Sequence, residues 1–88
     1  MEVRFRKSFE KDLGKLRDIE LLTRIKAMIE EAESTKNLAG LSNLKKLKTK
    51  GDFYRIRVGD YRMGLTADQG IICFVRVLHR KEIYRYFP

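Results

Sequence analysis

The stretch that decides the fold is GDFYRIRVGDYRMGL, Gly51–Leu65, in which two alternating runs of residues flank the dipeptide Gly59-Asp60. Side chains alternate between the two faces of a β-strand, and a two-residue connection that contains glycine suits a tight hairpin. The pattern therefore predicts two antiparallel strands with one apolar and one basic face. The apolar face would carry Tyr54, Ile56, Val58, Tyr61, Met63 and Leu65, and the basic face would carry Arg55, Arg57 and Arg62.

The segment before this hairpin predicts one strand and two helices. Met1–Arg6 alternates as a half-buried strand does. Ser8 and Asp18 are residue types that cap helices, and apolar residues at helical spacing follow each of them. We expect the two helices to pack as a hairpin on the apolar face of the strands. The second helix would do so through a stripe formed by Ile19, Leu22, Ile25, Ile29 and Ala32.

The remaining segments predict further strands. NLKKLKTKG, Asn43–Gly51, could include a short edge strand, and IICFVRVLH, Ile71–His79, is apolar on both faces, as a central strand is. The tail from Arg80 to Pro88 could form a short helical turn or an extended end. The expected order is β-α-α-β-β-β with a possible extra short strand. This order indicates an α+β fold with a small, mostly antiparallel sheet and a helical hairpin on one face.

Composition limits the class of protein. The 88 residues are enough for one domain with a modest core, so we expect residues 1–88 to form a single domain. The single cysteine cannot form an internal disulfide and no apolar run is long enough to span a membrane, which makes the cytoplasm the expected location. The net charge of +8 favours a nucleic acid or an acidic protein as a partner, although solubility alone would also account for it.

The residue types restrict the available chemistry. The sequence has no spaced cluster of acidic, cysteine or histidine residues and no glycine-rich phosphate loop, so it predicts neither a metal site nor a cofactor. Arginine, lysine, tyrosine and the lone His79 suit RNA cleavage by the neighbouring 2′-hydroxyl, in which a protein aligns the nucleophile and stabilises a negatively charged phosphorane. The alternatives are that the arginines form a solvated strand face and that His79 has a structural role.

Two segments resemble a known group of proteins. YRIRVGDYR, Tyr54–Arg62, followed by VRVLHRKEIYR, Val75–Arg85, is similar to the RelE/ParE superfamily of toxins from type II toxin–antitoxin systems. The resemblance covers nearly the whole chain and implies the same α+β fold. RelE-like members cut messenger RNA in the ribosomal A site without a metal, whereas ParE-like members poison DNA gyrase. Tyr84, which shortly follows Arg80, favours the RelE-like branch.

The resemblance also implies roles for individual residues. Arg55 and Arg57 would bind phosphate and the transition state, and Arg62 would bind the scissile phosphate. Arg80 would stabilise charge or assist the leaving group, while Tyr84 would stack on the substrate nucleotide. The best-known RelE toxin has lysines at the positions of Arg55 and Arg57, and arginine stays protonated. The general base is therefore open, and the catalytic set includes an acid or base at His79.

Further phosphate contacts and partners complete the hypothesis. The additional basic residues expected to bind RNA or phosphate are Lys45, Lys46, Lys48, Lys50, Arg76, Lys81 and Arg85. The expected partners are a cognate antitoxin, often acidic in this family, together with messenger RNA and the ribosomal A site, and no membrane. Two alternatives stay open, a ParE-like gyrase inhibitor without enzymatic activity and a catalytically inactive RNA-binding relative.

Overall fold

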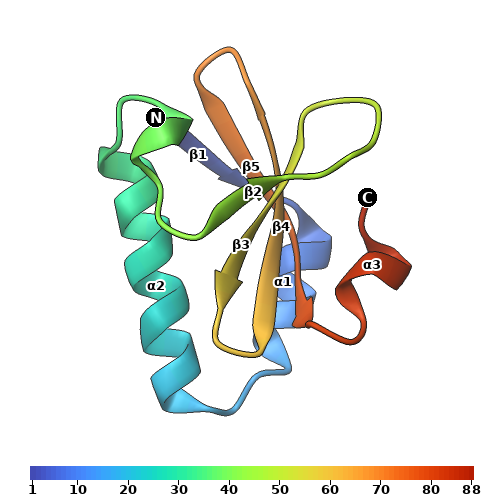
Figure 1. The fold of residues 1–88 in the computed structure, drawn as a ribbon. Coiled ribbons are helices and arrows are strands. Elements are labelled where there is room, and N and C mark those ends of the chain that lie inside the picture. Colours follow the sequence, from blue (N-terminus) through green and yellow to red (C-terminus); the bar gives the residue numbers. More distant parts are fainter.

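The computed structural model describes residues 1–88 as a five-stranded sheet with helices (Figure 1). In chain order the elements are β1 (Glu2–Phe5), α1 (Lys7–Gly14), α2 (Ile19–Ser34), the 3₁₀ helix η1 (Leu38–Gly40), β2 (Leu44–Lys46), β3 (Phe53–Val58), β4 (Tyr61–Asp68), β5 (Ile71–His79) and α3 (Ile83–Tyr86). The predicted α+β order is confirmed. The lysine-rich segment supplies the extra short strand β2, and the tail forms the short helix α3.

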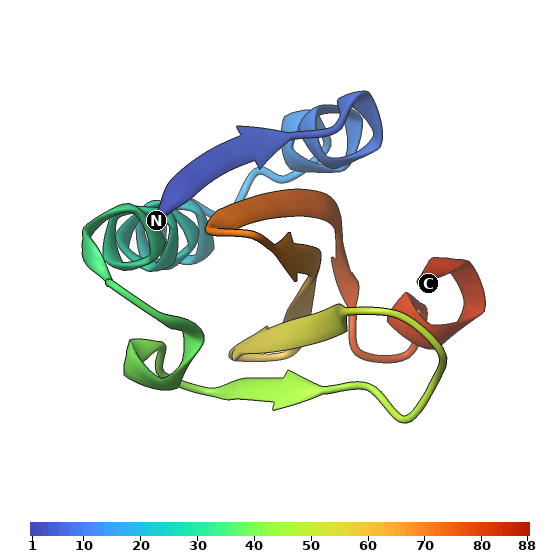
Figure 2. The same ribbon diagram turned by 90° about the horizontal axis from the view of Figure 1, so that it is seen from above.

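The sheet has the strand order β1-β5-β4-β3-β2, so β5 lies inside the sheet as expected. All neighbours are antiparallel except β1, which pairs with β5 in parallel. Seen from above, the sheet curves between α2 on one side and α3 on the other (Figure 2). None of the helices has the length and apolar character that a membrane span requires.

Helix α2 covers the apolar face of the hairpin through a stripe that includes Ile25, Ile29 and Ala32 of the predicted one. Asp18 caps the helix as expected, because its Oδ1 accepts a hydrogen bond from the Leu21 amide at 3.1 Å. The buried side chains of the helix are Leu21, Ile25 and Ala32, whereas Ile19 is 78% exposed, which corrects the prediction for Ile19. The cap places Ile19 at the first helical position, where its side chain points away from the sheet.

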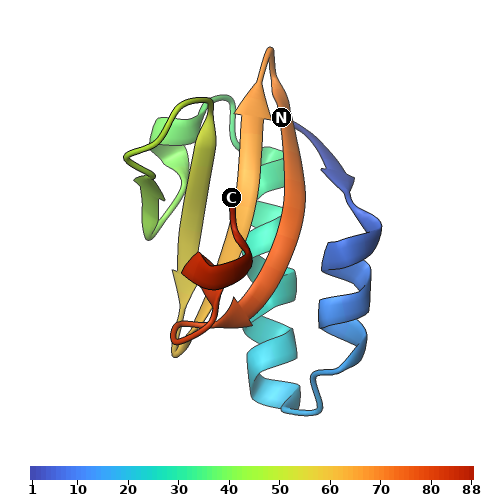
Figure 3. The ribbon, with the colours of Figure 1, turned by 90° about the vertical axis from the view of Figure 1, so that its right-hand side faces the viewer.

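Helix α1 lies along the edge of β5 rather than over the face of the sheet (Figure 3). Strand β1 pairs only with Ile71–Phe74, so the second half of β5, which pairs with β4 on one side, has no strand partner on the other side. Ser8 and Asp12, one turn apart on α1, supply partners instead. The Ser8 hydroxyl donates to the Val75 carbonyl at 2.6 Å, so the prediction that Ser8 caps the helix is wrong.

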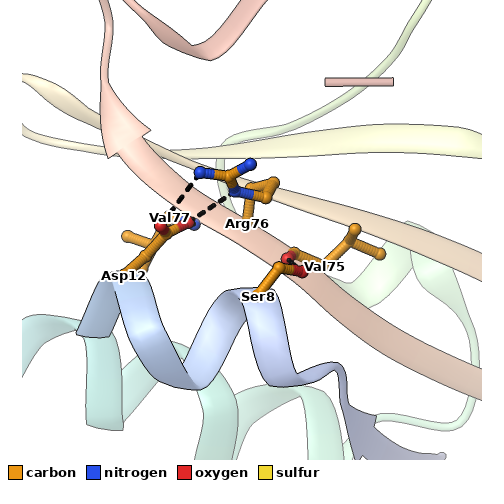
Figure 4. Close-up of polar contacts among 5 residues, drawn as sticks. All are labelled: Ser8, Asp12, Val75, Arg76 and Val77. Atoms are coloured by element: carbon orange, nitrogen blue, oxygen red, sulfur yellow. Dashed lines mark hydrogen bonds and ion pairs between the residues drawn. The ribbon is translucent and has the colours of Figure 1, made fainter. Parts of the chain in front are cut away.

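Asp12 is the only charged residue buried in the chain, with 6% of its surface exposed. Its carboxylate accepts hydrogen bonds from the Val77 amide at 3.1 Å and from the Arg76 Nε and Nη2 atoms at 2.7 and 3.0 Å (Figure 4). Burial of a carboxylate is unfavourable unless hydrogen bonds and an opposite charge compensate it, and here both are present. One aspartate therefore joins α1 to β5 through the backbone and a side chain.

A bulge in β5 determines which way Arg76 points. Gly64 is opposite Arg76 and Leu65 is opposite Phe74, so Val75 is an extra residue without a partner in β4. An extra residue reverses the alternation of side chains beyond it. Arg76 consequently lies on the face of Gly64, which α3 covers, and extends around the edge of the sheet to Asp12.

Replacement of Asp12 by alanine is expected to lower the free energy of unfolding by about 2–4 kcal/mol, because it leaves Arg76 and the Val77 amide without their partner. Urea denaturation measures this loss. The control is Glu10→Ala, which removes an exposed acid from the same helix and is expected to cost about 0.5 kcal/mol. Equal losses in the two variants would contradict the role assigned to Asp12.

Candidate functional site

The hairpin of β3 and β4 has the two faces that its sequence predicts. Ile56, Val58, Met63 and Leu65 are buried in the core under α2. On the opposite face Arg57 lies directly across from Arg62. Arg55 lies across from Gly64, which has no side chain of its own, and Lys45 of β2 lies across from Arg55 on the other side. The alternation of the strands thus gathers three arginines and a lysine on one face.

The turn between β3 and β4 brings in arginines from other elements. An open pocket of about 400 Å³ lies at this turn, and no apolar side chain lines it. Its arginines come from α2, from β3, from β4 and from the segment after β5. The lining residues are Arg24, Asn43, Arg57, Gly59, Asp60, Arg62 and Arg80. Helix α2, the β3–β4 hairpin and the segment after β5 therefore form one strongly basic pocket, which we call the arginine pocket.

Backbone carbonyl groups hold the guanidinium groups in place. Arg62 Nη1 donates to the carbonyl oxygens of Gly59 at 2.9 Å and of Tyr61 at 3.0 Å. Arg55 Nη1 donates to the Asn43 carbonyl at 3.1 Å, while the buried Arg55 Nε has no partner. Asn43 has a positive φ of 60°, a conformation that asparagine adopts more readily than most residues. These contacts orient the arginines without neutralising their charge.

Arg80, another arginine of the pocket, is held by the turn itself. The Arg80 amide donates to the Asp60 carbonyl at 2.7 Å, and the Arg80 Nε lies 3.8 Å from Asp60 Oδ1. Both side chains of this ion pair are largely exposed, so water screens the attraction and the pair contributes little to stability. Its effect is to keep Arg80 beside the hairpin turn.

Electrostatics confirm that the arginines act on one another. The pKa of the Arg62 guanidinium is lowered, first by partial burial and then by the positive charge of Arg55. Arg57 and Arg80 lower this pKa further, whereas the Tyr84 hydroxyl acts in the opposite direction. A lowered pKa means that the positive charge of Arg62 is less favourable here than in water. A bound anion would relieve this repulsion.

Tyr84 reaches the site because the tail is anchored on both sides of it. Ile83 and Phe87 are fully buried, whereas Tyr84 is 59% exposed. The ring of Phe87 packs over Gly64, where an added β-carbon would lie 2.7 Å from the ring, and edge-on against Phe53. The exposed phenol is thereby held close enough to Arg62 to act on its pKa.

His79 does not join the arginines. It pairs in register with Tyr61, on the face opposite to Arg62, and the two rings lie 5.5 Å apart with their planes nearly perpendicular. The His79 Nδ1 atom accepts a hydrogen bond from the Lys81 amide at 3.2 Å. The expectation that His79 lies beside the arginines is therefore corrected, because strand alternation places it on the other side of the sheet.

Arg76 is also separated from the arginine pocket. Its guanidinium bonds Asp12 through two nitrogen atoms, and the Tyr86 ring lies 5.5 Å from it. The hydrogen bond to Asp12 is the main cause of a raised pKa at Arg76. Because these donors are already in use, the structure places Arg76 in a structural ion pair rather than at a phosphate site.

The predicted lysines and the tail residues spread over several surfaces. Lys45 lies with Arg55 and Arg57 beside Asn43, in a second open pocket. Lys46 is on the other face, 5.9 Å from the Tyr54 ring and 4.0 Å from Asp52. The other four predicted phosphate contacts are exposed, two in the loop before β3 and two around α3, and none lines the arginine pocket: Lys48, Lys50, Lys81 and Arg85.

Arg24 and Asn43 are members of the pocket that the sequence pattern does not single out. In the sequence, Arg24 is one of several charges on the outer face of a helix, and Asn43 is the first residue of the lysine-rich segment. Only the packing of α2 against the hairpin and the course of the loop before β2 bring them to the turn. The structure contains no group of three or more histidine, cysteine, aspartate or glutamate residues that could hold a metal ion.

Comparisons with known proteins agree with this architecture. The family model described as the ParE toxin of the type II toxin–antitoxin system parDE matches residues 3–84. The chain is 46% identical to Toxin RelE3 of Methanocaldococcus jannaschii over 89 residues, an alignment that covers 100% of both chains.

Solved structures of two toxin–antitoxin complexes contain chains that are similar to this one. The toxin–antitoxin complex RelB-RelE from Methanococcus jannaschii contains a chain that is 44% identical, with a TM-score of 0.81 and coverage of 97% of this chain and 99% of that one. The archaeal RelE-RelB complex from Pyrococcus horikoshii OT3 shares the fold at 23% identity, with a TM-score of 0.73 and coverage of 93% and 97%.

Replacement of Gly64 by alanine is expected to displace Phe87 and to lower the free energy of unfolding by about 1–3 kcal/mol, because the new methyl group would overlap the ring. Urea denaturation gives the loss of stability, and faster tryptic cleavage after Arg85 reports the displaced tail. The control is Gly14→Ala, where the added β-carbon meets no atom within 4 Å and should be neutral or stabilising by up to about 1 kcal/mol. An unchanged cleavage rate would contradict the anchoring of the tail by Phe87.

Proposed function

The chain belongs to the ParE toxin family of type II toxin–antitoxin systems, and we propose that it is a RelE-like, ribosome-dependent endoribonuclease that cuts messenger RNA and thereby inhibits translation. The observation that carries this proposal is the gathering of Arg55, Arg57 and Arg62 on one face of the hairpin, with Arg80 at its turn and the exposed Tyr84 in the tail that packs over this face at Gly64. Guanidinium groups bond two phosphate oxygens at once, and an exposed aromatic ring can stack on a base of single-stranded RNA.

The proposed reaction breaks the RNA backbone with the RNA's own nucleophile. The 2′-oxygen attacks the adjacent phosphorus as its proton is removed, and the bond from phosphorus to the 5′-oxygen breaks as that oxygen takes up a proton. The phosphorane between these steps carries an additional negative charge. Preorganised cations are effective at stabilising such developing charge. Arg62, held by two carbonyl groups, suits the scissile phosphate.

The other residues of the cluster support the same step. Arg55 and Arg57 flank Arg62 on the sheet and would bind the remaining phosphate oxygens. Arg80, held at the turn, would stabilise the charge on the departing oxygen. Tyr84 would orient the nucleotide by stacking. Alignment and charge stabilisation are thus the contributions that this chain makes to catalysis.

Proton transfer in this proposal does not use His79. Its ring contacts Tyr61 on the opposite side of the sheet from Arg62. Asp60 is the ionisable side chain other than arginine that lines the arginine pocket, and the Tyr84 hydroxyl acts on the pKa of Arg62 from outside that lining. We assign no proton transfer to the arginines themselves, because a guanidinium group stays protonated.

A cognate antitoxin is the partner that we assign to this toxin. The M. jannaschii relative, which is 44% identical, is a complex of RelE with the antitoxin RelB. The net charge of +8 and the unneutralised arginines suit an acidic segment of such a protein. Messenger RNA and the ribosomal A site are the targets that follow from the proposed activity, and they place the toxin in the cytoplasm.

A ParE-like inhibitor of DNA gyrase is the second candidate, because the matching family model carries the ParE description. Tyr84 favours the nuclease, because its exposed aromatic ring can stack on a base of single-stranded RNA. Trapped gyrase–DNA complexes together with intact messenger RNA would contradict the nuclease and support the gyrase inhibitor.

Purified protein added to translating ribosomes is expected to cut messages inside codons, and Arg62→Ala is expected to lower the cleavage rate by at least about a hundredfold, because a preorganised charge is removed from the phosphorane. Mapping of messenger RNA ends measures the rate. Arg6→Ala removes an exposed arginine distant from the pocket and is the charge-matched control. Cleavage by Arg62→Ala at the control rate would remove Arg62 from the mechanism.

The variant His79→Gln is expected to retain cleavage at close to the rate of the unsubstituted protein, since His79 lies on the other face of the sheet. The same mapping of messenger RNA ends tests this, with circular dichroism to verify the fold. A loss of cleavage as large as that of Arg62→Ala in a folded protein would return His79 to the catalytic set.

A further inference from the structure

Arg24 is the member of the arginine pocket that the proposed mechanism does not use. It projects from α2, whereas the other three arginines of the pocket belong to the hairpin and to the segment after β5. Its side chain is exposed, and the ion pairs of the chain involve other residues. An unpaired arginine that lines a basic pocket adds repulsion to the free protein.

The turn is shaped to receive Arg24. Gly59 has a positive φ of 60°, and a β-carbon at this position would lie 3.1 Å from Arg24 Nη1. The absence of a side chain at Gly59 therefore lets the guanidinium group approach the backbone of the turn. The carbonyl of the same glycine accepts the hydrogen bond from Arg62 Nη1. Gly59 thus lies between two guanidinium groups that come from different layers of the fold.

The charge in the pocket exceeds what one phosphate neutralises. Four arginines and one aspartate line it, which leaves three positive charges in excess. A phosphodiester carries one negative charge, so the scissile phosphate alone leaves the pocket strongly positive. Arg24 reaches the pocket from α2 at the α-carbon of Gly59, whereas Arg62 reaches it from β4 and bonds the carbonyl of that glycine. Because the two guanidinium groups come to Gly59 from different elements, we assign them to different phosphates.

We propose that Arg24, at the Gly59–Asp60 turn, forms a second phosphate subsite that binds the backbone phosphate next to the scissile one in single-stranded RNA. This inference rests on the proposed nuclease function for the identity of the ligand. The lining of the pocket contains no apolar side chain, which suits a charged backbone rather than a base or an apolar peptide side chain. Successive phosphates of one strand supply the additional negative charges.

The test is binding of RNA that cannot be cut. A fluorescent 2′-O-methyl hexanucleotide and a dinucleotide with a single internal phosphate are titrated with protein at several salt concentrations. Fluorescence anisotropy gives the dissociation constants. The variants are Arg24→Gln and the control Lys26→Gln, which removes one charge from the same helix on the side of a groove lined by Phe5 and Ile29.

For the hexanucleotide, Arg24→Gln is expected to weaken binding about tenfold, as loss of a charged hydrogen bond does. The slope of log K against log salt should fall by about 0.7, which corresponds to one phosphate contact on a single strand. Lys26→Gln should leave the slope unchanged. For the dinucleotide, Arg24→Gln and Lys26→Gln should bind equally, because only one phosphate is present to bind.

Equal slopes for the two variants on the hexanucleotide, or no measurable binding by the unsubstituted protein at low salt, would overturn the proposal. So would a loss confined to binding of the cognate antitoxin, which would make Arg24 a protein contact. Arg24→Lys keeps the charge and should recover part of the affinity if phosphate binding is the cause. Circular dichroism verifies that each variant is folded.

The same proteins separate this inference from the proposed function. Absence of messenger RNA cleavage on ribosomes, with the slope change present, would refute the nuclease and leave the second phosphate subsite standing. Cleavage with equal slopes would refute the subsite alone.

Discussion

The interaction on which the rest of the structure depends is that of the Asp12 carboxylate with Arg76 and the Val77 amide. A parallel strand that ends halfway along β5 would leave an edge with unpaired backbone groups, and buried groups of that kind are costly. Asp12 supplies an acceptor at this edge and Arg76 compensates its charge. The same contact keeps α1 against β5, so that α2 can return across the apolar face of the hairpin.

The fold contains arginines that are paired with a carboxylate and arginines that are not. Arg76 has a buried carboxylate as its partner, and the ion pair raises its pKa. Arg62 is bonded only to carbonyl oxygens and lies among other arginines, which lower its pKa together with burial. The ion pair of Arg76 stabilises the fold. The arginines around Arg62 repel one another, and a bound anion would reduce that repulsion. The distinction between a structural and a ligand-binding arginine is therefore electrostatic, although the residue type is the same.

The tail shows how the fold positions a side chain for function. Ile83 and Phe87 occupy the core on either side of an exposed tyrosine, and Gly64 provides the space for the Phe87 ring. The glycine also leaves Arg55 without a cross-strand neighbour on β4. Gly64 thus lets Phe87 anchor the tail and leaves Arg55 without a facing side chain on β4.

Much of the site was predictable from residues that follow one another on strands. The pairing of Arg57 with Arg62 and the burial of Ile56 and Met63 on the reverse face follow from alternation and a two-residue turn. The position of His79 was not predictable in this way. The bulge at Val75 changes the alternation of β5, and a bulge depends on how two strands pair rather than on either strand alone.

The sequence by itself determined the order of the elements, the two faces of the hairpin, the cap at Asp18 and the resemblance to RelE/ParE toxins, because these depend on neighbours along the chain. Only the tertiary structure decided that Ser8 and Asp12 bond backbone groups at an edge of β5. It also decided that Asp12 neutralises Arg76 and that Arg24 reaches the turn between β3 and β4. The physical reason is that a charge acts on whatever lies near it in space, and those neighbours are set by how helices and strands pack.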